Sequence, residues 1–154
     1  MKKSLLVLVA VLAAAGAAQA DTLKKIKDSG SVTMGVRESS QPLSYTTGGG
    51  NYLGYHVEIC ERVLRNISKQ LGMGSLTTKY QPVTSQNRIP LVQNGTVDIE
   101  CGSTTNNVAR QKDVAFVVTT YVEEVRTAVR ANSGIASISQ LNGKNVATTT
   151  GTTS

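Results

Sequence analysis

Two arginines, Arg88 and Arg110, are the residues of this chain best suited to bind a charged ligand. They lie in TSQNRIPLVQNGTVDIECGSTTNNVARQ, residues 84–111, among serine, threonine, asparagine and glutamine side chains around one apolar run. Arginine stays charged at any working pH and can bind a carboxylate through two parallel hydrogen bonds. A stretch of this kind predicts a site for an anion.

A third arginine, Arg37, is expected beside these two because of the order of strands and helices. The sequence predicts strands at 31–37, 77–83 and 96–102, separated by helices. This alternation is typical of an α/β layer with a mainly parallel sheet, whose ligands lie beyond the carboxyl ends of the strands. Polar residues follow each strand at that edge: Arg37, Glu38 and Ser39 after the first, Thr84, Ser85 and Arg88 after the second, and residues 102–105 after the third.

The predicted helices follow from apolar spacing and from residues that begin or end helices. Apolar residues between 56 and 71 recur at intervals of three and four, which indicates one buried helical face. A helix capped by Ser85 is expected to start late or irregularly, because Pro90 lacks an amide hydrogen. The expected helices span 23–28 after a Thr22 cap, 56–71, 85–94, residue 105 or 106 to 112, and 137–143.

The remaining segments predict loops or extended chain. Residues 39–55, SSQPLSYTTGGGNYLGY, are rich in glycine, serine and proline and predict a loop, with a flexible hairpin as the alternative for the glycine-rich half. Residues 115–131 predict extended β structure that leaves one lobe for another. Residues 144–151 predict a strand that runs into a glycine turn.

The surroundings of the three arginines indicate a small ligand that bears more than one carboxylate. Helix N-termini after Ser85 and Thr105 would add amide donors and a favourable dipole. The hydroxyls of Ser103 and Thr105 can donate to a carboxylate or accept from an ammonium group.

Other interpretations stay open. Each arginine could be a surface cation or an ion-pair partner of Glu38, Glu100 or Asp113. Phosphate is the competing anion, although TTGGGNYLG lacks the x-G-K-[ST] ending of a phosphate-binding loop. The single histidine, His56, is expected at a helix start, and no metal or cofactor is expected.

The first twenty residues, MKKSLLVLVAVLAAAGAAQA, have the order of zones found in a secretory signal peptide. Lys2 and Lys3 precede an apolar run, and a small-residue cleavage motif ends at Ala20. Without these two lysines the formal net charge falls from +6 to +4. The remaining lysines are scattered and aromatic residues are few, which argues against nucleic-acid binding. A soluble exported protein is expected.

Export to an oxidising compartment would allow Cys60 and Cys101 to form one disulfide. The alternative is two separate buried thiols, because free cysteine behaves as a small hydrophobe. No local signature of a Ser-His-Asp or Cys-His catalytic centre is present.

Several segments resemble the periplasmic glutamate/aspartate-binding proteins of amino-acid ABC transporters, which form part of solute-binding protein family 3. These are GVRESSQPLSY, LGYHVEIC, VTSQNRIPLVQNGTVDIECGSTTNNVARQ and LNGKNVATTTGTTS. The resemblance implies a type II periplasmic-binding-protein fold, in which two α/β lobes joined by crossover strands close around one amino acid. It places the signal peptide at 1–20, the first lobe at 21–125, and a crossover strand with the start of a truncated second lobe at 126–154.

The resemblance also implies a role for each candidate residue. Arg110, with Ser103 and Thr105, would hold the α-carboxylate of the amino acid. Arg37 and Arg88, assisted by Ser85, would bind the side-chain carboxylate. The second lobe would contribute Thr152 and Thr153. The group that binds the α-ammonium would lie beyond Ser154, and a chain without its second lobe is expected to bind weakly or not at all.

The resemblance therefore implies a monomeric periplasmic protein that captures glutamate or aspartate and delivers it to an ABC transporter permease. One alternative is an enzyme on the same scaffold, of dehydratase or peptidoglycan-cleaving type, because a fold does not fix a function. The other alternative is binding of another amino acid. An enzyme would need a general acid or base facing the ligand. The candidates, Glu38 and Glu100, are expected instead to be ion-pair partners of arginines.

Overall fold

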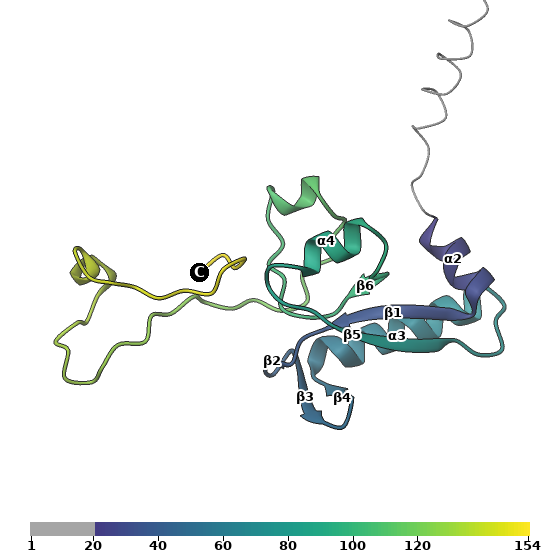
Figure 1. Ribbon diagram of the computed structural model, residues 1–154, viewed down its shortest axis with the longest axis horizontal. Coiled ribbons are helices and arrows are strands. Elements are labelled where there is room, and N and C mark those ends of the chain that lie inside the picture. Colours follow the sequence, from purple (N-terminus) through teal and green to yellow (C-terminus); the bar gives the residue numbers. More distant parts are fainter. Residues whose placement is uncertain (1–20) are drawn as a thin grey trace, which may run out of the picture.

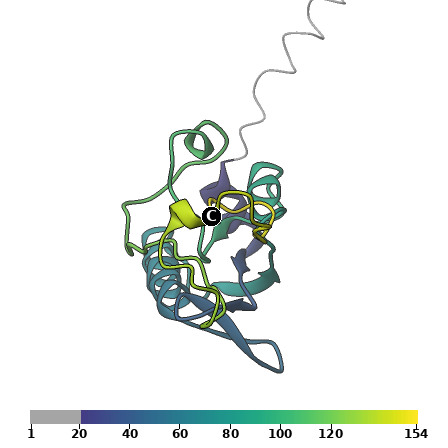
Figure 2. The same ribbon diagram turned by 90° about the vertical axis from the view of Figure 1, so that its left-hand side faces the viewer.

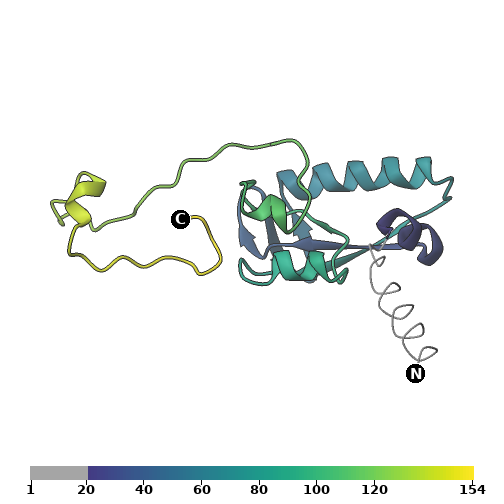
Figure 3. The same ribbon diagram turned by 90° about the horizontal axis from the view of Figure 1, so that it is seen from above.

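The computed structural model describes residues 21–154, so the predicted signal peptide at 1–20 lies outside the described residues (Figure 1). Residues up to about 114 form an α/β body. The chain then leaves this body as an extended segment and returns toward it, so that the C-terminus faces the body again (Figures 1 and 3).

A parallel three-stranded sheet forms the centre of the body, as the alternation of strands and helices predicts. Strand β1 (Ser31–Val36) lies between β5 (Thr77–Pro82) and β6 (Ile99–Glu100). Pairing with β5 runs the full length of β1, from Ser31 opposite Thr77 to Val36 opposite Pro82. The ladder with β6 covers only two residues, so the third strand is shorter than the predicted 96–102.

Helices cover both faces of this sheet. Helix α3 (Tyr55–Gln70) lies along one face and α4 (Arg88–Gln93) on the other, while α2 (Thr22–Ser29) precedes β1 (Figure 3). Two short 3₁₀ helices, η2 (Arg110–Lys112) and η3 (Ile138–Leu141), stand where helices are expected near 106–112 and 137–143.

Two predicted helix caps are wrong. The N-cap of α2 is Asp21, whose carboxylate accepts a hydrogen bond from the Lys24 N–H, and Thr22 is already helical. Ser85 does not cap α4, which begins only at Arg88. A turn precedes the helix, in which the Thr84 N–H donates to Asn87 Oδ1 and the Asn87 N–H donates to Thr84 Oγ1.

The predicted loop at 39–55 is for the most part a small antiparallel sheet. Its strands are β2 (Ser39–Ser40), β3 (Ser44–Gly48) and β4 (Asn51–Leu53). Glycines at positions 48–50 all have positive φ angles, which glycine adopts without steric cost, and they turn the chain between β3 and β4. The hairpin alternative for the glycine-rich half is therefore confirmed.

The expectation of strands at 115–131 and 144–151 is wrong in this structure. Neither segment forms a strand, and its apolar side chains remain exposed, with Val118 82% and Val122 85% exposed. Valine favours a half-buried pleated surface, but a strand also needs a neighbour to accept its hydrogen bonds. Within residues 21–154 no strand lies beside either segment.

The hydrophobic core lies between α3 and the sheet. Alternate residues of β1 point toward the helix, which buries Val57 and Leu64 against them, and Ile26 of α2 joins the same cluster. Cys60 of α3 and Cys101, just after β6, form a disulfide in this core with an S–S distance of 2.03 Å. The disulfide thus joins α3 covalently to the residue that follows β6, at the end of the sheet where the arginines lie.

Candidate functional site

The carboxyl edge of the sheet gathers the three predicted arginines. Arg37 directly follows β1, Arg88 is the first residue of α4, and Arg110 begins η2. The sequence brings Arg37 to this edge because β1 ends there. It brings the other two there because α4 and η2 are the first helical turns after β5 and β6.

Arg37 is held at the edge by its backbone and its side chain. Its N–H donates to Ser44 Oγ at 2.9 Å, its Nη1 donates to the Val83 carbonyl at 2.8 Å, and its Nε donates to Ser40 Oγ at 3.2 Å. Ser103 Oγ also contacts Ser40 Oγ, at 3.3 Å. Two predicted site residues, Arg37 and Ser103, therefore share a contact with Ser40, which was not among the predicted site residues.

Arg88 is buried, with 3% of its surface exposed. Its Nη2 makes one long contact of 3.5 Å with the Gly151 carbonyl, while Nε and Nη1 have no hydrogen-bond partner among the described residues. Burial lowers the pKa of this guanidinium; Glu100 opposes the shift, and the charges of Arg110 and Arg37 add to it. A buried cation with two unused donors is costly unless an anion meets it.

Arg110 reaches the same carbonyl from the other side. Its Nη2 donates to the Gly151 oxygen at 3.0 Å, and its Nη1 donates to the Thr105 carbonyl at 3.1 Å. Two guanidinium groups, from α4 and η2, thus converge on one oxygen acceptor, the Gly151 carbonyl. The arrangement can hold an anionic oxygen between two cations.

The C-terminal turn contributes to this edge only in part (Figures 2 and 3). Gly151 lies so close to the turn before α4 that a Cβ atom on it would stand 2.6 Å from the Ser85 carbonyl oxygen. Thr153 Oγ1 lies 3.2 Å from Thr105 Oγ1. Thr152 Oγ1 instead donates to the Thr149 carbonyl at 2.7 Å, so the structure does not bring this predicted hydroxyl to the arginines.

A hollow of about 390 Å³ opens beside the arginines. Its lining comes from the ends of β1 and β5, the turn before α4, and the C-terminal segment, and it includes Arg37, Ser85 and Thr149. Small ligands bind in concave sites with a few polar groups that fix their orientation. Arg37 is the one of the three arginines on this lining, so the hollow gives a small polar molecule access to Arg37.

Glu100 lies at this site, where the sequence predicts an ion-pair partner of an arginine rather than a general acid or base. No ion pair within 4.0 Å joins it to an arginine among residues 21–154. Burial raises the pKa of its carboxyl, against the opposing influence of Thr104, Arg88, the Gly102 N–H and Arg37. The available signal in the sequence was weak, because the predicted strand 96–102 contains a second acidic residue, Asp98.

His56 connects the arginine edge with the extended segment. Its Nδ1 lies 2.5 Å from the Gly102 carbonyl oxygen, and its Nε2 lies 2.9 Å from Thr120 Oγ1. Tyr55 Oη also donates to the Thr120 carbonyl, at 3.3 Å. The predicted helix-start histidine thus lies at the start of α3, where it holds the chain as it leaves the body.

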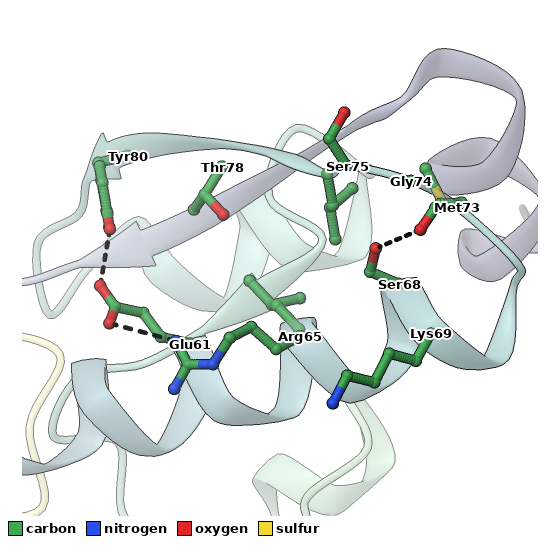
Figure 4. Close-up of a pocket in the computed structure, with 11 residues that line it drawn as sticks. Glu61, Arg65, Ser68, Lys69, Met73, Gly74, Ser75, Thr78 and Tyr80 are labelled. Atoms are coloured by element: carbon green, nitrogen blue, oxygen red, sulfur yellow. Dashed lines mark hydrogen bonds and ion pairs between the residues drawn. The ribbon is translucent and has the colours of Figure 1, made fainter.

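A second hollow, of about 420 Å³, lies between α3 and β5 and contains none of the three arginines (Figure 4). Tyr80 Oη donates to Glu61 Oε1 at 2.9 Å on its wall. Burial, and then this hydrogen bond, raises the pKa of Tyr80. The cations on its lining, Arg65 and Lys69, are both exposed, whereas the first hollow includes the half-buried Arg37 of the predicted site.

Residues 21–154 contain no group of three histidine, cysteine, aspartate or glutamate side chains that could hold a metal ion. None of the helices within this range has both the length and the apolar character that a membrane crossing requires.

Comparison with known proteins places these observations in a family. Residues 32–150 match the bacterial extracellular solute-binding proteins, family 3. A Pseudomonas aeruginosa protein named L-glutamate/L-aspartate-binding protein is 49% identical over 134 residues, which cover 86% of this chain and 44% of that protein. The Escherichia coli K12 glutamate/aspartate import solute-binding protein is 41% identical over 162 residues, which cover 100% of this chain and 54% of that protein.

The fold agrees with this match. The crystal structure of the ancestral amino acid-binding protein AncCDT-1, described as a precursor of cyclohexadienyl dehydratase, superposes with a TM-score of 0.50 at 26% identity. The superposition covers 60% of this chain and 37% of that one. The predicted type II periplasmic-binding-protein fold is confirmed for the part of it that these residues form. The chain spans about half the length of the relatives it matches.

Proposed function

Because the chain belongs to the bacterial extracellular solute-binding proteins, family 3, we propose that the complete protein binds an acidic amino acid, L-glutamate or L-aspartate, for import by an ABC transporter permease. Here the complete protein means this chain with any further residues that its gene encodes. Two relatives of 49% and 41% identity carry names for this binding. The arginine edge supplies the chemistry that such a ligand requires.

The observation that carries the proposal is the state of Arg88. It is almost wholly buried, and its Nε and Nη1 donors lack partners among the described residues. A carboxylate is the planar anion that such a pair of donors binds with two parallel hydrogen bonds. Arg88 would therefore bind the side-chain carboxylate, with Arg37 and Ser85 beside it.

The α-carboxylate would bind at Arg110, with Ser103 and Thr105. The oxygen that Arg88 and Arg110 share in this structure is a backbone carbonyl, and a ligand oxygen would offer the same acceptor with a full negative charge. A ligand with two carboxylates could then engage both arginines at once. Thr152 and Thr153 would complete the site from a second lobe.

The lobes would divide as the sequence analysis expects, with the first lobe at 21–125 and the start of the second at 126–154. The extended segment from 126 onward, with its exposed Val129 and Val146, would pair with strands of that second lobe. We propose a periplasmic monomer, released from its signal peptide at 1–20, in which the lobes close around the ligand.

Competition between radiolabelled glutamate and unlabelled ligands tests the proposal directly. Equilibrium dialysis of the complete protein with radiolabelled glutamate should give saturable binding that unlabelled glutamate or aspartate displaces. Glutamine should displace roughly a hundredfold less effectively, because it leaves a buried arginine uncompensated at about 3–5 kcal/mol, with about 1.4 kcal/mol per factor of ten. Equal displacement by glutamine, or displacement by phosphate alone, would refute the proposal.

One observation favours an enzyme as the second candidate. Glu100 is a buried carboxyl with a raised pKa at the ligand site, which is a property of general acids. AncCDT-1, a structural neighbour, is described as a precursor of a dehydratase. Prolonged incubation of glutamate with the complete protein, followed by mass spectrometry, should return unchanged glutamate; a new product would favour the enzyme.

A further inference from the structure

Four buried side-chain atoms of the described residues lack hydrogen-bond partners, and all four belong to one cluster. They are Arg88 Nε, Arg88 Nη1, Glu100 Oε1 and Thr104 Oγ1. Glu100 ends β6 and is paired in register with Gly35 of the central strand. Its carboxylate therefore lies at the carboxyl end of a strand that is paired with the central strand of the sheet.

The backbone at Gly102 shows how tightly this carboxylate is placed. A Cβ atom on Gly102 would stand 2.2 Å from Glu100 Oε1 and 2.6 Å from Arg37 Cγ. Real Cβ atoms do not approach other atoms so closely, so only glycine leaves room for both side chains. The sequence Glu-Cys-Gly at 100–102 thus brings the carboxylate and the Arg37 side chain together over one backbone position.

The carboxylate is close to the arginines but is not paired with them. It raises the pKa of Arg88 against burial, and Arg88 and Arg37 in turn lower that of Glu100. Thr104 is near enough to lower it too, yet no hydrogen bond of good geometry joins the two groups. Arg37, Arg88 and Arg110 thus share this edge with the carboxylate of Glu100.

We propose that Glu100 is a positioning residue and resident counter-ion for Arg88 and Arg37, and that it takes up one proton when the side-chain carboxylate of an acidic ligand binds beside it. The inference rests on the proposed function. In the ligand-free protein the ionised carboxylate reduces the repulsion among three arginines. When the ligand arrives, two carboxylates compete for the same cations, and the buried one is neutralised.

The physical reason is like-charge repulsion in a buried place. Two carboxylates that share a site cannot both stay ionised, and the pKa of one of them rises strongly. Glu100 is the better candidate, because burial has already raised its pKa in the absence of ligand. The groups that face it are Arg88 from α4, Arg37 from the end of β1, and Thr104 and the Gly102 N–H from the loop after β6.

Proton uptake by Glu100 determines how the affinity for glutamate should change with pH. The proton comes from solvent and binds to a Glu100 carboxylate oxygen, and no other bond forms or breaks. Because the pKa is higher in the bound state than in the free state, the bound protein holds more protons between these two values. Affinity for glutamate should therefore fall as pH rises through that window, by up to about tenfold per pH unit for one proton.

Isothermal titration calorimetry of the complete protein with glutamate tests the inference. Titrations in two buffers of different ionisation enthalpy, at several values between about pH 5 and pH 8, count the protons taken up per ligand. The wild-type protein should take up between zero and one proton, with a maximum inside this range. Glu100→Gln should take up none, and its Kd should be independent of pH.

Two further variants separate a proton-binding role from a structural one. Glu58→Gln removes an exposed carboxylate from the first turn of α3 and should behave like the wild type. Glu100→Asp keeps a carboxylate and should restore part of the proton uptake that Glu100→Gln loses.

Each outcome decides something. Glutamate binding without proton uptake by the wild type at any pH in the range would overturn the role of Glu100 and leave the proposed function intact. Proton uptake that persists in Glu100→Gln would also overturn the role of Glu100 and leave the proposed function intact. A complete protein that gives no heat with glutamate would overturn both.

Discussion

Replacement of Arg88 should remove the preference for an acidic ligand over its neutral amide. The variant Arg88→Met keeps a long apolar side chain in a site that is 3% exposed, so the surrounding contacts are largely retained. It deletes the charge and the donors Nε and Nη1, which have no partner among the described residues. The proposed function requires these two donors to meet the side-chain carboxylate.

The magnitude follows from those two donors. A hydrogen bond to a charged group contributes about 1.5–3 kcal/mol and a neutral one about 0.5–1.5 kcal/mol. The guanidinium is charged with either ligand, but glutamate accepts two bonds and neutralises the buried cation, whereas glutamine accepts one bond and leaves the charge uncompensated. The difference is about 3 kcal/mol, a factor of roughly a hundred. Arg88→Met should therefore raise the Kd for glutamate by roughly a hundredfold or more, and the Kd for glutamine by less than about tenfold.

Calorimetry with both ligands is the assay, with two control variants. Arg88→Lys keeps the charge but not the planar pair of donors, so its Kd for glutamate should fall between those of wild type and Arg88→Met. Arg62→Met makes the same exchange at an exposed position of α3 and should change neither Kd. A thermal unfolding curve for each variant shows that the fold is retained.

Equal losses for glutamate and glutamine in Arg88→Met would refute this reasoning. Arg88 would then bind a group that both ligands share, or would hold the structure of α4. An unchanged Kd for glutamate would remove Arg88 from the site altogether.

Three further changes have defined outcomes. Arg110→Ala should raise the Kd for glutamate and for glutamine by the same factor in calorimetry, because both carry the α-carboxylate; a selective loss would contradict its assignment. Joint replacement of Cys60 and Cys101 by serine opens a loop of 41 residues and should lower the free energy of unfolding by about 4 kcal/mol in urea titrations; an unchanged value would contradict the chain-entropy argument. Gly102→Ala places a Cβ 2.6 Å from Arg37 Cγ and should weaken glutamate binding by roughly tenfold to a hundredfold through displacement of that arginine; wild-type affinity would show that Arg37 can move without loss.

Local pattern and topology together predict the body of the fold and the place of the arginines. The spacing of apolar residues indicates α3 because one face of that helix is buried, and it holds Val57, Cys60 and Leu64. Arg37 could be assigned to the same edge as residues about fifty positions later because parallel strands end together. That inference needs only the order of the elements.

Features that depend on distant contacts could not be predicted. The burial of Glu100 requires knowledge of which side chains cover β6, and the sequence alone shows two acidic residues, Asp98 and Glu100, in one predicted strand. The valines around Val118 favour β structure, yet no strand forms without a neighbour to accept its hydrogen bonds. The small sheet at 39–55 has strands as short as two residues, too short for an alternating pattern to indicate them.

A crystal structure of the complete protein with bound glutamate tests the central claim most directly. The account predicts one ligand carboxylate within hydrogen-bond distance of Arg88 Nε and Nη1, and the other at Arg110. A ligand bound elsewhere, or one whose side-chain carboxylate does not contact Arg88, would contradict it.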